Sequence, residues 1–325
     1  MIDSALKEKL KKQHYFIVGK HSAVQVCRWA KKSLLDEGAC YKEKFYGIKS
    51  HLCCQMTPSV VWCDNKCLHC WRAIELTLGK KIKGKTDSAK EIIDGCIKAQ
   101  RKLLNGFGSN KKLNRKKFSE AQEPIQFAIS LSGEPMIYEK TGEIIHELRK
   151  RGKTSFLVTN GLHPEKIKEL RIKKQMPTQL YISVNAPNEE LYKKICRSSM
   201  KDAWKKFNQS LELISELKNK TRTVFRINLI KDLNMKKEFT KEYCRLIKKS
   251  NPMFIEIKGY MSVGYARERL GYERMPWHDD IINFAKDIEK ECRKLGMKYK
   301  ILDEHEFSRV AVLGKNKKDL KIKKI

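Results

Sequence analysis

The sequence predicts an α/β protein built around a parallel sheet. From about residue 56 onwards, short apolar runs typical of buried strands alternate with longer segments of helical periodicity. About six such pairs follow one another, and successive strand–helix–strand units form parallel sheets with right-handed crossovers. The 325 residues are enough for one large domain of this kind. The pattern alone leaves open a full barrel, a partial barrel or a doubly wound sheet.

The individual elements follow from the same alternation. Strands are expected at 58–62, 126–131, 154–159, 179–184, 223–230, 253–260, 298–303 and 309–314. Helices are expected at 91–104, 141–152, 163–173, 202–218, 236–250 and 278–296. Residues 109–118 hold five basic residues and no acid, which predicts an exposed loop or the start of a helix. The Lys-rich tail at 315–325 is expected to fray.

Charge and cysteine content narrow the class of protein. Lys and Arg number 70 against 38 Asp and Glu, a formal net charge of +32. Such an excess favours a polyanionic partner, although a generally basic proteome would give the same charge. The sequence shows neither a membrane-spanning apolar run nor the apolar core of a signal peptide, so we expect a cytoplasmic protein with reduced thiols. Eleven cysteines in that compartment indicate metal or redox chemistry.

The stretch "WCDNKCLHCW" (62–71) places Cys63, Cys67 and Cys70 directly after the first expected strand. Structural zinc takes four closed ligands, and an electron-carrying [4Fe–4S] cluster also takes four. Three thiolates on one loop would leave one iron open for a substrate or cofactor. A zinc loop completed by His69 or by another cysteine is the alternative.

The C-x3-C-x2-C spacing, with His69 before the last cysteine, resembles the motif of radical S-adenosylmethionine (SAM) enzymes. A second motif, "SLSGEP" (130–135), resembles the G-G-E-P strand end of that superfamily. The resemblance implies that SAM chelates the open iron and that Gly133, Glu134 and Pro135 receive its amino group. It also implies that one electron from the reduced cluster cleaves SAM to a hydrogen-abstracting 5′-deoxyadenosyl radical. Ser132 stands where many members have glycine.

Polar residues also end or follow the later expected strands. We expect Asn160, Ser183, Asn185 and Asn228 to be cofactor contacts, with turn formation and capping as the alternative. Arg226 shares a strand face with Asn228, because side chains alternate with period two, and it could meet a carboxylate or a phosphate.

Cys27, Cys40 and Cys53 follow a C-x12-C-x12-C spacing that is too wide for a zinc knuckle. They could hold a second cluster or be buried and inert, as Cys54 is expected to be. The stretches 18–34, 40–72 and 255–280 resemble archaeal 4-demethylwyosine synthases of tRNA wybutosine synthesis. That resemblance implies a partial (β/α)6 TIM-like barrel over 56–303. It also implies an extension over 1–55 whose three cysteines bind a second [4Fe–4S] cluster, and a basic segment over 304–325.

The resemblance further implies a carbon–carbon lyase that condenses pyruvate with N1-methylguanosine of tRNA-Phe. It places Lys42 where an amine would form a Schiff base with pyruvate, its pKa lowered by cationic neighbours such as Lys44. A separate electron donor and a monomeric enzyme are expected. Substrate contacts are expected from basic residues around 109–117 and 314–324, from Arg226 and Lys258, and by stacking from Tyr260 and Trp277. Other two-cluster RNA-modifying enzymes, such as methylthiotransferases, and a zinc-stabilised RNA-binding protein are the alternatives.

Overall fold

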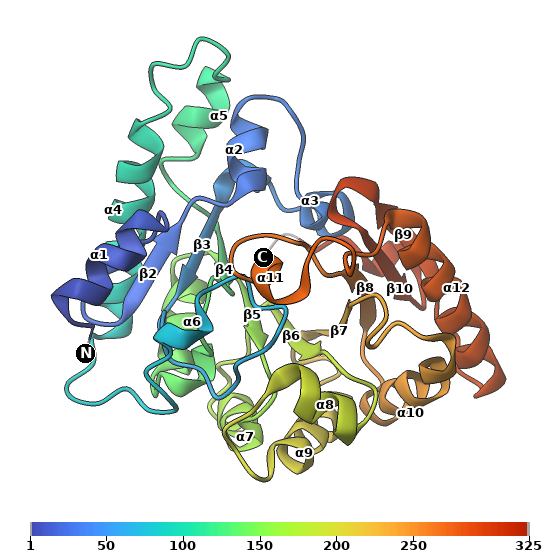
Figure 1. Ribbon diagram of the computed structural model, residues 1–325. Helices are drawn as coiled ribbons and strands as arrows, with labels where there is room; N and C mark the ends of the chain where they lie inside the picture. The colour runs from blue at the N-terminus through green and yellow to red at the C-terminus, as the bar shows by residue number, and fades with distance from the viewer. Residues whose placement is uncertain (1, 324–325) are drawn as a thin grey trace.

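The computed structural model describes residues 2–323, which form a single ten-stranded sheet in the order β1-β2-β3-β4-β5-β6-β7-β8-β10-β9. Strands β3 to β8 are parallel, and the antiparallel pairs β1–β2 and β10–β9 flank them. The strands are β1 (Phe16–Val18), β2 (Ser22–Gln25), β3 (Cys53–Thr57), β4 (Gln126–Ile129), β5 (Thr154–Thr159), β6 (Gln179–Val184), β7 (Arg222–Leu229), β8 (Phe254–Gly259), β9 (Lys300–His305) and β10 (Val310–Gly314). The sheet curves into an open barrel (Figure 1), which confirms the predicted partial barrel.

Twelve α-helices are present among the described residues, and most of them cover the outer face of the sheet, whereas the one at 41–46 enters the barrel. They are α1 (Ser4–Lys12), α2 (Arg28–Leu34), α3 (Tyr41–Tyr46), α4 (Ala89–Asn105), α5 (Arg115–Glu120), α6 (Thr141–Lys150), α7 (Pro164–Ile172), α8 (Glu189–Cys196), α9 (Ala203–Ser215), α10 (Thr240–Ser250), α11 (Ala266–Leu270) and α12 (His278–Lys294). Local sequence sets their starts: a Ser88–Glu91 capping box opens α4, and Pro164 opens α7. Within residues 2–323, no helix combines the length and apolar character needed to cross a bilayer.

Alternation along the strands creates two separate cores. One set of strand residues, with Leu157, Leu180, Phe225 and Ile255 among them, packs against the outer helices. The alternate residues, with Phe156, Tyr181, Val224 and Phe254 among them, face the barrel interior. There they meet Tyr41, Phe45 and Tyr46 of α3, so the N-terminal segment fills the barrel that the later strands enclose.

The first expected strand is displaced. Residues 58–62 are buried, as predicted, but they form a loop, and the strand is the preceding β3. The run is apolar because it is enclosed between the sheet and the segment that follows β4. The expected boundaries at 55/56 and 303/304 fall inside β3 and β9, so the extension and the C-terminal segment are parts of the same sheet.

The C-terminal tail is docked as far as it is described, and the expectation that it frays is wrong there. Arg222 donates hydrogen bonds to the carbonyls of Asp319 (2.9 Å) and Leu320 (2.7 Å), and Ile322 N–H donates to the Tyr46 carbonyl (3.0 Å). Since Arg222 begins β7, the tail covers the amino ends of the strands. The described basic residues within 314–323 are therefore at the wrong end of the barrel to hold a substrate at its mouth, and Lys324 lies outside the described residues.

Leu320 should anchor this tail, because its side chain is 3% exposed within the interior core. Leu320→Ala should lower the free energy of unfolding by about 2–4 kcal/mol, the usual effect of truncating a buried leucine. Anaerobic urea denaturation measures the change, with the exposed Lys318→Ala as control. Equal midpoints for the two variants would show that the tail is not anchored.

Candidate active site

A cavity of about 290 Å³ opens at the carboxyl ends of the parallel strands. This is the end at which barrel enzymes bind their ligands. Most of the residues predicted from the sequence line it: Cys63, Cys67, Cys70, Gly133, Glu134, Asn160, Ser183, Asn185, Arg226, Asn228 and Lys258. Because they come from several different strand ends and one loop, the fold and not local sequence brings them together.

The cysteine loop is held from above by α11. The Arg269 guanidinium donates to the backbone carbonyls of Leu68 (3.1 Å), Cys70 and Arg72 (3.3 Å). On the other side of the loop, Leu68 N–H donates to the Ile195 carbonyl at 2.9 Å. The loop that carries the three thiols is therefore fixed before any ligand binds.

The "SGEP" segment is tied to the loop that leads into Cys63. Ser132 Oγ donates to the Val60 carbonyl (2.9 Å), and Glu134 N–H donates to the Trp62 carbonyl (2.7 Å). Gly133 has φ +68°, and a Cβ there would lie 1.8 Å from the Ser59 carbonyl oxygen. Glycine is therefore required at 133 because the backbone there approaches this loop closely. Ser132, where many members have glycine, donates one of the hydrogen bonds to the loop.

Glu134 is 2% exposed, and its carboxylate accepts hydrogen bonds from Thr159 Oγ1 (2.6 Å), Asn160 N–H (2.7 Å) and Met136 N–H (3.1 Å). Burial nevertheless raises its pKa to about 7, against the opposing effects of His163 and of these donors. A cationic ligand group in the cavity would restore the charged form.

The residues around the cysteine loop fit an anionic group bound by the thiols and a polar ligand beside it. Burial alone would lower the pKa of Arg72, but Cys70, Cys63 and Cys67 together raise it, so a buried cation faces the three thiols. Within the described chain, four polar atoms that line the cavity are buried without a partner: Asn65 Oδ1, His69 Nδ1, Asn185 Oδ1 and Asn228 Nδ2. Buried polar atoms normally have partners, so these atoms indicate a polar ligand.

A single metal ion fits less well. Among residues 2–323, no group of three His, Cys, Asp or Glu side chains is arranged to hold one. Tetrahedral zinc would need thiolates about 3.8 Å apart, from bonds of about 2.3 Å, whereas a cluster of four irons accepts ligands that are farther apart. The geometry gives no support to the zinc loop completed by His69.

The second set of cysteines gathers at the other end of β3. Cys27 and Cys40 precede α2 and α3, and Cys53 begins β3. Burial raises the pKa of all three thiols, that of Cys40 to about 12, and each thiol feels the charge of Lys42. The three cysteines are therefore close together in space, although they are widely spaced in the sequence. Cys54, adjacent to this group, is fully buried in the outer core, as expected.

Lys42 lies close to the second set of thiols and to Arg226. Its Nζ is 5.1 Å from the ring centroids of both Phe156 and Tyr181, and the Arg226 guanidinium is 4.2 Å from the same Tyr181 ring. Burial, and then Arg226, lower the pKa of Lys42. The cation beside it is therefore Arg226 and not Lys44, which pairs with Asp303 at 3.0 Å.

Apart from Lys42 and the second set of cysteines, three predicted residues do not line the cavity. Tyr260 is 1% exposed, and its hydroxyl donates to the carbonyls of Ala266 (3.0 Å) and Gly271 (3.2 Å), so the prediction that it stacks on a base is wrong. Pro135 is buried at the start of a short 3-10 turn. Trp277 lies outside the cavity and is 53% exposed.

Sequence reasoning missed three groups. Arg72 directly follows the cysteine motif, and Glu256 is a lone acid in the apolar run of β8, so both left a detectable signal. The ion pair between Asp64 and His163, at 2.8 Å, connects the cysteine loop to the turn after β5, and no signal in the sequence predicts it.

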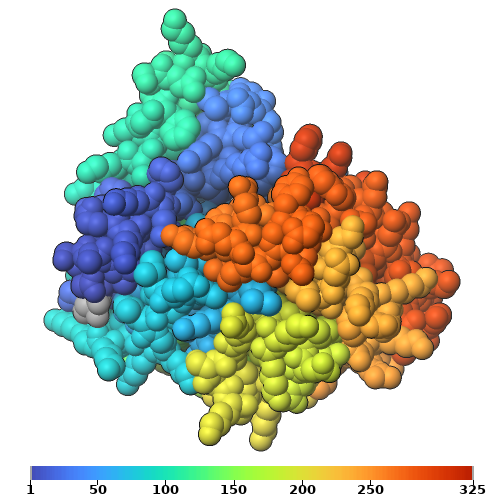
Figure 2. All heavy atoms as spheres, in the orientation of Figure 1, coloured from blue at the N-terminus to red at the C-terminus, as the bar shows by residue number. Residues whose placement is uncertain are grey.

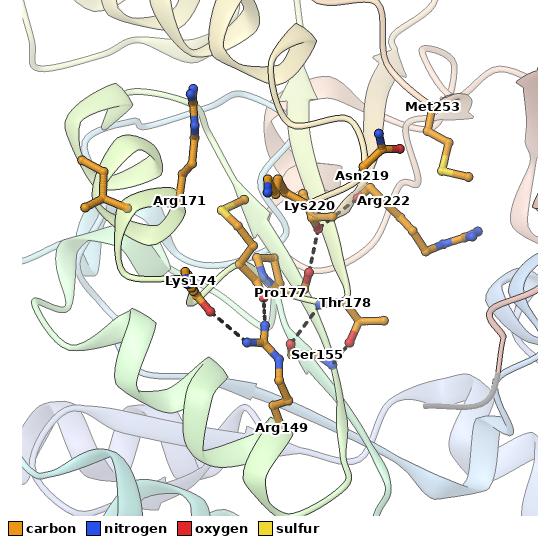
Figure 3. A pocket seen from close by; sticks show the side chains of 13 residues that line it. Arg149, Ser155, Arg171, Lys174, Pro177, Thr178, Asn219, Lys220, Arg222 and Met253 are labelled. Atoms are coloured by element: carbon orange, nitrogen blue, oxygen red, sulfur yellow. Dashed lines mark hydrogen bonds between the residues drawn. The ribbon is translucent and has the colours of Figure 1, made fainter.

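A larger cavity, of about 980 Å³, lies at the amino ends of β5 to β7. Figure 3 shows its basic side chains, but two of its arginines serve the fold. Arg149 donates to the carbonyls of Lys174 (2.9 Å) and Met176, and Arg222 holds the tail. Since this is the end opposite to Cys63, Cys67 and Cys70, we do not assign it to the active site.

The open barrel, the three-cysteine loop at its mouth and the adjacent "SGEP" segment define a radical SAM enzyme. Residues 57–244 match the radical SAM superfamily, whose members carry a [4Fe–4S] cluster and SAM. Residues 249–315 match a second family, described as wyosine base formation.

The chain belongs to the family of S-adenosyl-L-methionine-dependent tRNA 4-demethylwyosine synthases. It is 46% identical over 309 residues to the Pyrococcus abyssi enzyme of that name, covering 95% of this chain and 88% of the relative. The Methanocaldococcus jannaschii enzyme is 37% identical, with 96% of each chain covered. A structure of TYW1 with a lysine-pyruvate adduct bound superposes with a TM-score of 0.85 at 36% identity, covering 99% of this chain and 98% of the other. The family decides against the methylthiotransferase and the non-catalytic zinc protein.

Glu134 should control SAM affinity through its charge. With a pKa of about 7, its ionised fraction rises from about a tenth at pH 6 to about nine tenths at pH 8. Binding of the SAM ammonium should therefore tighten as pH rises through this range. Glu134→Gln should weaken binding by roughly ten-fold or more at pH 8 and flatten the pH dependence. Anaerobic calorimetry measures both effects, with the exposed Glu143→Gln as control. Unchanged affinity in the Glu134→Gln variant would disprove the contact.

Proposed function

We propose that this chain joins two carbons of pyruvate to N1-methylguanosine in tRNA-Phe, with loss of the pyruvate carboxyl carbon, and closes the third ring of 4-demethylwyosine. Two [4Fe–4S] clusters would serve the reaction, one on Cys63, Cys67 and Cys70 and one on Cys27, Cys40 and Cys53. The observation that carries the proposal is the position of Lys42. Its amine is close to the second set of thiols and to Arg226, which lines the SAM cavity.

A lysine in this position suits the pyruvate half of the reaction. A primary amine condenses with a ketone to a Schiff base, and it must be neutral to attack. Burial and Arg226 both lower the pKa of Lys42, which favours its neutral form. The lysine-pyruvate adduct named for the TYW1 structure supports the same chemistry here.

The cavity also has the charge to hold a carboxylate. Arg226 and Lys258 line it, and burial, followed by Arg226, lowers the pKa of Lys258 to about 8. Among the described residues, the acid that pairs with one of these two cations is Glu256, which accepts a hydrogen bond from Arg226 Nε at 2.9 Å. An excess of positive charge therefore remains for the carboxylate of pyruvate or of SAM.

The base half of the reaction needs a radical. An N-methyl group has no proton acidic enough for a side-chain base, and the reduced cluster with bound SAM supplies the hydrogen-abstracting chemistry. The protein must bring the methyl group into the cavity, which requires the base to leave the stack of the anticodon loop. The exposed Lys111, Lys112 and Lys116, on the projecting arm that includes α5 (Figure 2), are available for the RNA backbone, whereas Lys117 pairs with Asp36.

Lys42→Arg should keep the charge but abolish the adduct. Borohydride reduction of the wild-type protein with labelled pyruvate should add mass to the peptide that contains residue 42. The variant should show no such mass and no ring product, while uncoupled SAM cleavage continues. Lys44→Arg, two residues away and 49% exposed, is the matched control. An adduct that persists in the Lys42→Arg variant would remove Lys42 from the mechanism.

Cys53→Ala should remove the second cluster alone. Anaerobic reconstitution should load about eight irons on the wild type and about four on the variant, which should still cleave SAM. Cys54→Ala, at the adjacent buried position, should retain the wild-type iron content. A wild type with about four irons, or equal loading of the two variants, would contradict the assignment of the second cluster.

A further inference from the structure

Three large aromatic side chains are exposed in one segment of the chain. Tyr272 is 55% exposed, Trp277 53% and Phe307 79%, and we call them the rim aromatics. The other exposed large apolar residues in the described chain are aliphatic: Leu78, Ile125, Ile172 and Val263. All three rim aromatics lie within 249–315, the wyosine base formation match, and outside the radical SAM match. This distribution associates them with the substrate and not with the cofactor.

Phe307 belongs to a turn that borders the active-site cavity. This turn connects β9 to β10 and is bonded to the carboxyl end of β8. Lys258, which lines the cavity, donates from Nζ to the Ser308 carbonyl at 2.9 Å, and Gly259 N–H donates to the Arg309 carbonyl at 2.9 Å. The position of Phe307 relative to the cavity is therefore fixed by the sheet.

Trp277 is held in place beside the same turn. The Arg309 guanidinium lies 4.1 Å from the Trp277 ring centroid and donates to the Pro276 carbonyl at 2.9 Å. Tyr272 meets Trp277 edge to face, with centroids 6.0 Å apart and planes at 69°. The group combines aromatic faces with a stacked cation, which is the composition of surfaces that bind single-stranded nucleic acid.

Phe307 has support on one side only. Its ring is 6.4 Å from that of His305, which meets Trp29 of α2 edge to face at 5.3 Å. Figure 2 shows this red segment beside the blue one that carries α2. The rest of the ring is open to solvent, and packing in the fold does not account for that exposure. An apolar ring exposed at a binding mouth is a common mark of an interaction site.

We propose that Phe307 stacks on an unpaired base of the anticodon loop next to the base that enters the cavity, with the Trp277–Arg309 pair holding a neighbouring base. This inference rests on the proposed function. When a base leaves its stack, the bases on either side of it each lose a stacking partner. A fixed aromatic ring at the mouth replaces that partner for one of these neighbouring bases. The surface suits RNA better than an acidic protein, because it offers exposed ring faces on which bases stack.

The test uses a stem-loop RNA with N1-methylguanosine and 2-aminopurine at the adjacent position. Phe307→Ala should raise the KM for this RNA roughly ten-fold or more and reduce the quenching of 2-aminopurine on binding. Turnover at saturating RNA and SAM cleavage without RNA should not change. Phe307→Trp should behave as wild type, whereas Phe307→Leu, which keeps apolar bulk but has no ring, should behave as Phe307→Ala. The slope of affinity against salt should stay the same, since no phosphate contact is removed.

Ile172→Ala is the matched control, because Ile172 is 78% exposed but lies at the amino ends of the strands. Wild-type behaviour of Phe307→Leu, or Phe307→Ala equal to the Ile172→Ala control, would overturn the inference. Binding and 2-aminopurine quenching are read without turnover. A wild type that makes no ring product would therefore refute the proposed function, while a loss of quenching in Phe307→Ala would still support the stacking contact.

Discussion

The structure depends on one buried carboxylate inside the barrel. Glu256 of β8 is fully buried and accepts hydrogen bonds from Tyr41 Oη (3.1 Å), Tyr46 Oη (2.6 Å) and Arg226 Nε (2.9 Å). A buried charge without partners would destabilise the protein by several kcal/mol, on the order of 3–5. The sheet alone supplies Arg226, and α3 supplies both tyrosines. The barrel is therefore complete only when the N-terminal segment has entered it.

This constraint connects the second set of thiols to the wall of the cavity through Arg226. The segment that brings Tyr41 to Glu256 also brings Lys42 and Cys40, while Arg226 extends from the same ion pair to the wall of the SAM cavity. The tail closes the other end of the barrel through Arg222, and the turn between β9 and β10 shapes the mouth through Lys258. Substrate can therefore approach from the side where the cysteine loop, the carboxylate of Glu134 and the rim aromatics lie.

Much of this arrangement could be predicted where the signal is local. Strands β5 and β6 begin and end at the predicted residues, because each is a continuous apolar run with a clear turn after it. The predicted residues that line the cavity followed from motifs and from strand ends, whereas Lys42 and the second set of cysteines followed only from the family resemblance. The run at 58–62 was misleading because a loop enclosed by tertiary contacts can be as apolar as a strand. The different exposure of Tyr260 and Phe307 depends on tertiary packing, which sequence periodicity does not encode. The role of Glu256 becomes clear only when Tyr41 and Tyr46 are seen to face it.

The central claim is that the two sets of cysteines hold two clusters that face one chamber beside Lys42. Anomalous diffraction at the iron edge, from crystals of anaerobically reconstituted protein, tests it most directly. The account predicts two separate iron sites, one against Cys63, Cys67 and Cys70 and one against Cys27, Cys40 and Cys53, with Lys42 and Arg226 between them. A single iron site, or a second site away from Lys42, would contradict it.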